Sequence, residues 1–132
     1  MKFQIGDKAS FTKTVSESDI YLFAGITGDM NPAHIDDVAM KNSKFGGRIA
    51  HGMLCAGFIS AVLGMRMPGP GTIYLGQTLK FLAPVRMGDT VTATAEVVEI
   101  IDNKRLKVHT TCTIQDGTVV VDGEALVLPP RD

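Results

Sequence analysis

Several features are absent or scarce in this 132-residue chain. Residues 1–13 hold no apolar run of the kind that a secretory signal needs, and the most apolar stretch, Met53–Met65, is too short to cross a bilayer. Only two cysteines occur, Cys55 and Cys112, which indicates free, packed thiols in a reducing compartment. The net charge of −1 gives no reason to expect nucleic acid or an anionic membrane as a partner. We therefore expect a cytoplasmic protein that inserts into no membrane and binds no nucleic acid.

Acidic residues are missing from the middle of the chain. No Asp or Glu lies between Asp37 and Asp89, whereas six basic residues do: Lys41, Lys44, Arg48, Arg66, Lys80 and Arg86. Two explanations stay open at this point. A buried helix in this interval would exclude carboxylates. Alternatively, loops that flank such a helix present cations to a phosphorylated ligand.

Composition and length predict one globular domain spanning residues 1–132. Apolar residues make up 45% of the chain and charged residues 20%, which is ordinary for a soluble domain, and no repeat or linker interrupts the sequence. Ser16 and Asp19 have the spacing of a capping box, and Gly28 would end the helix that follows. A second, short helix is expected near residues 36–41.

The remaining pattern predicts a long buried helix followed by strands. Ala50–Leu63 is almost entirely apolar, as expected for a helix that the fold surrounds. Four later segments have the alternation or composition of strands: residues 73–81, 90–101, 106–114 and 118–128. Helices first and an antiparallel meander afterwards indicate an α+β protein. The simplest arrangement is an antiparallel sheet curled around one central hydrophobic helix, which is the hot-dog fold.

Asp29 and His34 are the first candidates for chemistry. They lie five residues apart across an Asn-Pro turn, and such a turn can bring both side chains to one point. A carboxylate and an imidazole that share one water molecule are suited to general acid–base catalysis near neutral pH. The alternative is that Asp29 caps the following turn and that His34 is an ordinary surface histidine.

A second candidate lies at the start of the predicted central helix, in residues 49–53. A helix N-terminus offers unpaired N–H groups and a partial positive charge, and Gly52 has no side chain to keep a ligand carbonyl away. This arrangement suits an oxyanion hole. The alternatives are close helix–sheet packing at Gly52 and a hydrogen-bonded internal ring at His51.

Together these segments resemble a known family. Residues 23–36 (FAGITGDMNPAHID) and 45–53 (FGGRIAHGM) are similar to the hydratase motif of the MaoC-like family, which comprises (R)-specific enoyl-CoA hydratases and related dehydratases. Residues 73–77 and 81–89 resemble the family's strand and turn, and the similarity extends from about Gly6 to Pro129.

The resemblance implies a hot-dog hydro-lyase that reversibly adds water to trans-2-enoyl-CoA and forms (R)-3-hydroxyacyl-CoA. Asp29 and His34 match the family's catalytic pair, and Gly52 matches the residue whose N–H binds the thioester oxygen. Asn31 and Ser60 match supporting residues near the dyad.

The resemblance also bears on partners and cofactors. The short form resembles the bacterial stand-alone hydratases of polyhydroxyalkanoate supply, and the family implies a homodimer. The expected partner is an acyl-CoA thioester. No metal and no cofactor are expected, because coenzyme A is part of the substrate.

Three other functions stay open. A dehydratase of fatty-acid synthesis would perform the same chemistry on acyl-carrier-protein thioesters. A hot-dog thioesterase would resemble relatives with a carboxylate on or beside the central helix, and this chain has none there. A non-catalytic acyl-CoA binding module would not need both Asp29 and His34.

Overall fold

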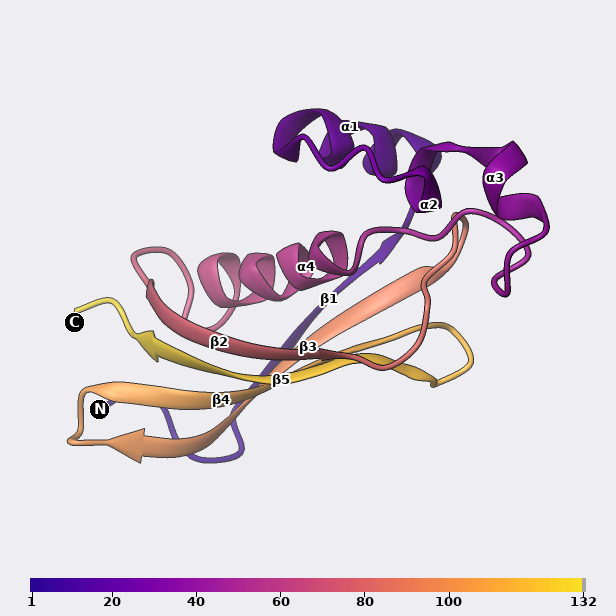
Figure 1. Cartoon of the computed structure of the whole chain (residues 1–132). Helices are drawn as coiled ribbons and strands as arrows, with labels where there is room; N and C mark the ends of the chain where they lie inside the picture. The colour runs from indigo at the N-terminus through magenta and orange to yellow at the C-terminus, as the bar shows by residue number, and fades with distance from the viewer. Residues whose placement is uncertain (132) are drawn as a thin grey trace.

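The computed structural model describes residues 1–131, which form one five-stranded antiparallel sheet and four helices (Figure 1). The elements are β1 (Lys8–Thr14), α1 (Glu17–Thr27), α2 (Pro32–Ile35), α3 (Asp37–Lys41), α4 (Gly52–Met65), β2 (Ile73–Phe81), β3 (Thr90–Ile101), β4 (Arg105–Thr113) and β5 (Val119–Leu128). Figure 1 shows α4 lying along one face of the sheet, with α1, α2 and α3 in a layer beyond it. No helix of the described residues is both long and apolar enough to span a membrane.

The α+β class and the hot-dog arrangement are confirmed, but the strand order is not a simple meander. The order across the sheet is β1-β3-β4-β5-β2. Only β3, β4 and β5 form a meander of consecutive strands. Strand β2 pairs with β5 and is not a neighbour of β3, the next strand in the sequence. Strand β1, which was not predicted from the sequence, pairs with β3 at the opposite edge. As a result β1 and β2 are the two edge strands.

The core lies between α4 and the sheet. Alternate residues of β3 and β4 point toward α4 and are buried: Val91, Ala93, Ala95, Val97, Leu106, Val108 and Cys112. From α4 the buried residues are Cys55, Ala56, Phe58, Ile59, Val62 and Leu63. Burial of these side chains contributes roughly 1.5–3 kcal/mol for each large aliphatic or aromatic residue.

Helix α4 differs from its prediction in two ways. It begins at Gly52 instead of Ala50, because His51 has extended backbone dihedral angles and occupies the N-cap position. The chain also does not surround the helix completely, since Met53, Gly57, Ser60 and Met65 are exposed. The sheet covers one side of α4 only, and an apolar composition by itself does not say how many sides are covered.

Local capping groups determine where α1 and α2 begin and where α1 ends. Ser16 caps α1 in a capping box with Asp19, and Gly28 ends α1 in the left-handed conformation, as predicted. The side chain of Asn31 then accepts a hydrogen bond from the Ala33 N–H and caps α2. These caps place the loop between α1 and α2, which carries Asp29, directly before the helix that carries His34.

Candidate active site

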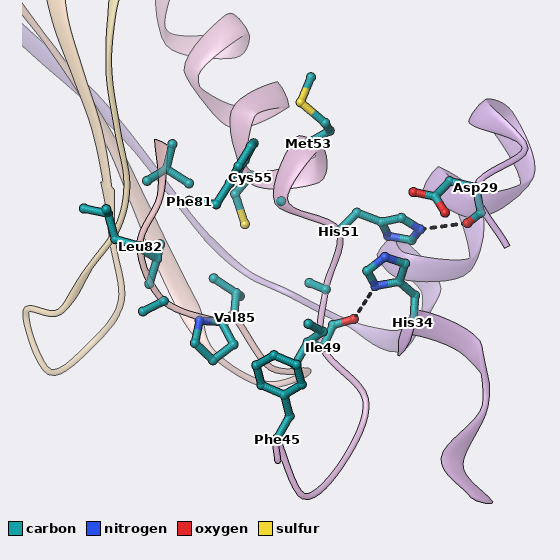
Figure 2. A pocket seen from close by; sticks show the side chains of 16 residues that line it. Asp29, His34, Phe45, Ile49, His51, Met53, Cys55, Phe81, Leu82 and Val85 are labelled. Carbon is teal, nitrogen blue, oxygen red and sulfur yellow. Dashed lines mark hydrogen bonds between the residues drawn. The ribbon is translucent and has the colours of Figure 1, made fainter. Parts of the chain in front are cut away.

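Asp29 and His34 lie together, as the turn between them predicted. One carboxylate oxygen of Asp29 and one ring nitrogen each of His34 and His51 all lie within 4.8 Å of one another. Asp29 is exposed, and its Oδ1 accepts a hydrogen bond from the Asn31 N–H at 3.3 Å. Figure 2 shows Asp29, His34 and His51 grouped on one side of a pocket. The structure therefore supplies the geometry that a shared water molecule requires.

The ring of His34 is oriented by a backbone carbonyl. His34 is buried, and its Nδ1 lies 2.8 Å from the carbonyl oxygen of Ile49. A carbonyl oxygen only accepts hydrogen bonds, so Nδ1 carries the proton and Nε2 of the neutral ring keeps its lone pair. Ile49 also donates its own N–H to the Ala33 carbonyl at 3.0 Å. Helix α2 is thus joined to the segment before α4, and the free Nε2 is available as a base.

Arg48 joins the elements around His34. Its side chain is only 4% exposed and forms ion pairs with Glu17 of α1 and Asp37 of α3. It also donates to the Tyr21 hydroxyl at 3.2 Å and to the backbone carbonyl of His34 at 3.4 Å. The hydrogen bonds to both carboxylates raise the pKa of this guanidinium, so its charge is permanent. One of the six cations of the acid-free interval is therefore internal and is not available to a ligand.

Gly52 starts α4 with a free donor. Within residues 1–131 no hydrogen bond uses its N–H, since the first N–H groups of a helix have no partner within the helix. Packing also requires glycine here, because an added Cβ would lie 2.6 Å from two ring atoms of Phe81, the last residue of β2. The two explanations of Gly52, an oxyanion donor and close helix–sheet packing, are therefore compatible.

The pocket has a volume of about 420 Å³ and is polar on one side only. Asp29, His34, His51 and Gly52 form the polar side. The remaining wall is mostly apolar and comes from the loop before α4, from α4 itself, and from β2, β5 and the loop after β2: Phe45, Ile49, Ala50, Met53, Cys55, Phe81, Leu82, Ala83, Pro84, Val85, Val120 and Val121. An apolar cavity with a few convergent polar groups is typical of a small-molecule site.

Cys55 lines this pocket but does not supply a nucleophile. Burial raises the pKa of its thiol to about 11, and burial likewise raises the pKa of Cys112 to about 12. Both cysteines are free, and the Cys112 thiol lies 3.4 Å from the Cys55 carbonyl oxygen. A thiol with so high a pKa is protonated at neutral pH, and only the thiolate is a strong nucleophile.

The polar group fits acid–base chemistry better than metal binding. Asp29, His34 and His51 are the one set in the described chain that brings together three potential metal ligands. The His34 and His51 rings are stacked, however, with centroids 3.8 Å apart and planes at 27°. The lone pairs of stacked rings lie in nearly parallel planes, and one nitrogen of each ring is bonded to a backbone carbonyl. For both rings to coordinate one metal ion, at least one ring would have to rotate out of the stack.

The two supporting residues are placed differently. Asn31 reaches the dyad indirectly, since it caps the helix that carries His34 and its N–H contacts the Asp29 carboxylate. Ser60 is exposed and lies two turns along α4, in a second hollow of about 480 Å³. This hollow also contains Phe23 and Tyr74 and shares only Met53 with the pocket of the dyad. Within the single chain Ser60 is not brought to the dyad.

Comparison with known proteins decides the family. The family described as MaoC like domain matches residues 2–118. The chain belongs to the MaoC-like family. It is 58% identical over 126 residues to an (R)-specific enoyl-CoA hydratase of Rhodospirillum rubrum, with coverage of 95% of this chain and 87% of the relative. It is 49% identical to a 3-hydroxybutyryl-CoA dehydratase of Methylorubrum extorquens, with 97% and 82% coverage.

A solved member of the MaoC-like family has the same fold. The (R)-hydratase from Aeromonas caviae involved in PHA biosynthesis superposes with a TM-score of 0.94 at 38% identity, covering 98% of each chain. Two features of the site were not predicted from the sequence: the ion pairs of Arg48 and the contacts of His51 with the dyad. Both residues lie inside the motif at residues 45–53, but no local pattern indicated their partners.

Proposed function

We propose that this MaoC-like protein is an (R)-specific enoyl-CoA hydratase, a hydro-lyase that interconverts trans-2-enoyl-CoA and (R)-3-hydroxyacyl-CoA. Two relatives named as hydratases support the reaction class and the (R) product, at 58% and 40% identity. The geometry adds the juxtaposition of Asp29, His34 and a free Gly52 N–H around one pocket. This juxtaposition is the observation on which the proposal rests.

The residues act in one sequence of bond changes. Asp29 and Nε2 of His34 hold a water molecule, and one of them accepts a proton from it as the new C3–O bond forms. The C2–C3 π electrons move toward the thioester, so negative charge develops on its oxygen. The Gly52 N–H and the N-terminal end of α4 stabilise that charge. The dyad then returns a proton to C2. The net change is addition of water, so the proposal includes no metal and no cofactor.

Substitution of the dyad tests this proposal. We expect Asp29→Asn and His34→Ala each to lower hydration of crotonyl-CoA by about 10²–10⁴-fold, the usual contribution of an acid–base group. Loss of the enoyl absorbance measures the rate, and chiral analysis of the product measures the (R) fraction. Circular dichroism and the unfolding midpoint serve as controls for folding. Wild-type turnover in both folded variants would remove the dyad from the mechanism.

Two exposed cations lie next to pocket-lining residues in the sequence. Lys44 precedes Phe45, and Arg86 follows Val85, and both of these neighbours line the pocket. Both cations are exposed, and the Arg86 guanidinium lies near Gly47, about 4.0 Å from where a Cβ would be. We propose that they contact phosphate groups of coenzyme A. The same cations would suit an acyl carrier protein, so turnover of matched crotonyl-CoA and crotonyl-carrier substrates distinguishes the two donors.

Hydrolysis of the thioester is disfavoured by the same pocket. Among its lining residues within the described chain only Asp29 carries a carboxylate, and it lies beside His34 and not on α4. Release of free thiol from acyl-CoA without loss of the enoyl absorbance would favour a thioesterase. Tight binding of acyl-CoA without turnover at any chain length would favour a binding module.

We propose a homodimer formed along β2. This edge strand exposes Ile73, Tyr74 and Leu75, and the exposed side of α4 borders the same hollow. A long apolar edge strand is normally covered in a native protein. Sedimentation equilibrium should give twice the monomer mass, and Leu75→Glu should lower the association constant.

The free, buried thiols of Cys55 and Cys112 support our proposal that the protein is located in the reducing cytoplasm.

A further inference from the structure

His51 contacts both members of the dyad. It is 2% exposed and is the N-cap residue of α4, immediately before Gly52. Its Nε2 lies 3.0 Å from the backbone carbonyl oxygen of Asp29. Its ring stacks on His34 at a centroid distance of 3.8 Å, and it also packs against Phe23 of α1 at 4.8 Å. Figure 2 shows His51 next to both Asp29 and His34.

The hydrogen bonds fix opposite tautomers in the two histidines. The Asp29 carbonyl only accepts a hydrogen bond, so His51 carries its proton on Nε2. Nδ1 of His51 is then an acceptor, and it is buried without a hydrogen-bond partner within residues 1–131. His34 is the reverse, with its proton on Nδ1. The free nitrogen of His34 faces the pocket as Nε2, whereas the free nitrogen of His51 is enclosed by the protein.

We propose that His51 is a positioning residue that holds the dyad in register with the oxyanion donor. Its Nε2–H fixes the backbone of Asp29, and its ring supports the face of His34. Because Gly52 is the next residue, the same side chain sets the distance between the dyad and the Gly52 N–H. This role rests on the proposed hydratase function.

Two variants separate the hydrogen bond from the stack. His51→Gln keeps an N–H donor near the position of Nε2 but loses the ring, whereas His51→Phe keeps the ring and loses the donor. Loss of one hydrogen bond of this kind corresponds to about tenfold. We expect His51→Phe to lower kcat for crotonyl-CoA about tenfold with KM within about twofold, and His51→Gln, which keeps the donor but not the ring, to lose less. Wild-type kcat in His51→Phe, or equal losses in both variants that follow their unfolding midpoints, would overturn the role.

A spectroscopic measurement tests the same inference without turnover. Nitrogen-15 chemical shifts of the histidine rings in the wild-type protein report which nitrogen is protonated. We expect the Nε2–H form for His51 and the Nδ1–H form for His34. An Nδ1–H form of His51 would overturn the inference. Absence of hydratase activity in the wild type would instead refute the proposed function and leave the tautomer result standing.

Discussion

Removal of the Arg48 side chain tests whether the short helices are held by one guanidinium. In Arg48→Met the aliphatic part of the side chain is kept and all of its hydrogen bonds are lost. The two ion-pair partners are partly solvated, with Glu17 48% and Asp37 78% exposed, so each pair contributes less than about 1 kcal/mol. The bonds to the Tyr21 hydroxyl and the His34 carbonyl add roughly 1 kcal/mol together. The expected loss of unfolding free energy is therefore up to about 3 kcal/mol.

Thermal unfolding and steady-state kinetics measure the two consequences of this change. For a chain of this size the loss corresponds to a decrease in Tm of up to roughly 10 °C. We expect kcat to fall about tenfold at a temperature where the variant is folded, because the His34 backbone loses one of its attachments. Arg48→Lys should recover only part of both, since an ammonium group cannot bridge α1 and α3 as the planar guanidinium does.

Arg66→Met is the matched control for loss of an arginine. Arg66 is exposed and contacts the Phe11 ring at 5.9 Å near the end of α4, so its loss should cost less than about 0.5 kcal/mol. A Tm for Arg48→Met within 2–3 °C of wild type, on the same size scaling, would refute the reasoning. So would a normal kcat in a clearly destabilised Arg48→Met, because the role of Arg48 in placing His34 would then be wrong.

Three further predictions concern Gly52, Asn31 and Cys55. Gly52→Ala should destabilise the fold by about 1–3 kcal/mol by denaturant unfolding, because the added methyl group meets the Phe81 ring, and adding Phe81→Ala should relieve that conflict; hydration that is lower in the folded double variant than in Phe81→Ala alone would show that the methyl group hinders access to the Gly52 N–H. Asn31→Ala should cost about 1 kcal/mol by denaturant unfolding and lower kcat, whereas Asn31→Asp keeps the cap of α2 and should be near wild type in stability. Folding raises the pKa of Cys55 from 9.0 to about 11, so the unfolded chain loses that proton first and Cys55 should contribute a fall in stability of up to roughly 3 kcal/mol as pH rises from about 9 to 11; in Cys55→Ala the fall measured by denaturant unfolding should be smaller by this amount.

Local signals predicted much of the fold and of the dyad. The capping box at Ser16, the left-handed Gly28 and the turn before Pro32 act over a few residues, so their consequences can be read from the sequence. Asp29 and His34 belong to the same short segment, and their meeting needed only that local geometry. Strand β1 was missed because five of the seven residues of Lys8–Thr14 are exposed and none is buried, so its alternation did not stand out from the polar N-terminus.

Long-range pairing was beyond prediction from a single sequence. The apolar pattern of β2 is the same whichever strand it pairs with, so its place beside β5 could not be derived. The partners of Arg48 lie 31 and 11 residues away, and the carbonyl that binds His51 lies 22 residues away. The excess of basic residues between Asp37 and Asp89 left open that Arg48 binds a phosphorylated ligand. In the structure Arg48 is internal and pairs with Glu17 and Asp37.

The site combines groups that are individually unfavourable for stability. The unpartnered Nδ1 of His51 costs about 1–3 kcal/mol, and the free N–H of Gly52 and the exposed Asp29 add nothing to the core. These groups persist because attachments around them fix the backbone: the Ile49–Ala33 and Ile49–His34 hydrogen bonds, the Arg48 ion pairs and the Phe81 contact on Gly52. His51→Phe removes this unpartnered nitrogen, so it should lower stability less than it lowers kcat, whereas substitutions of the attachments should lower both.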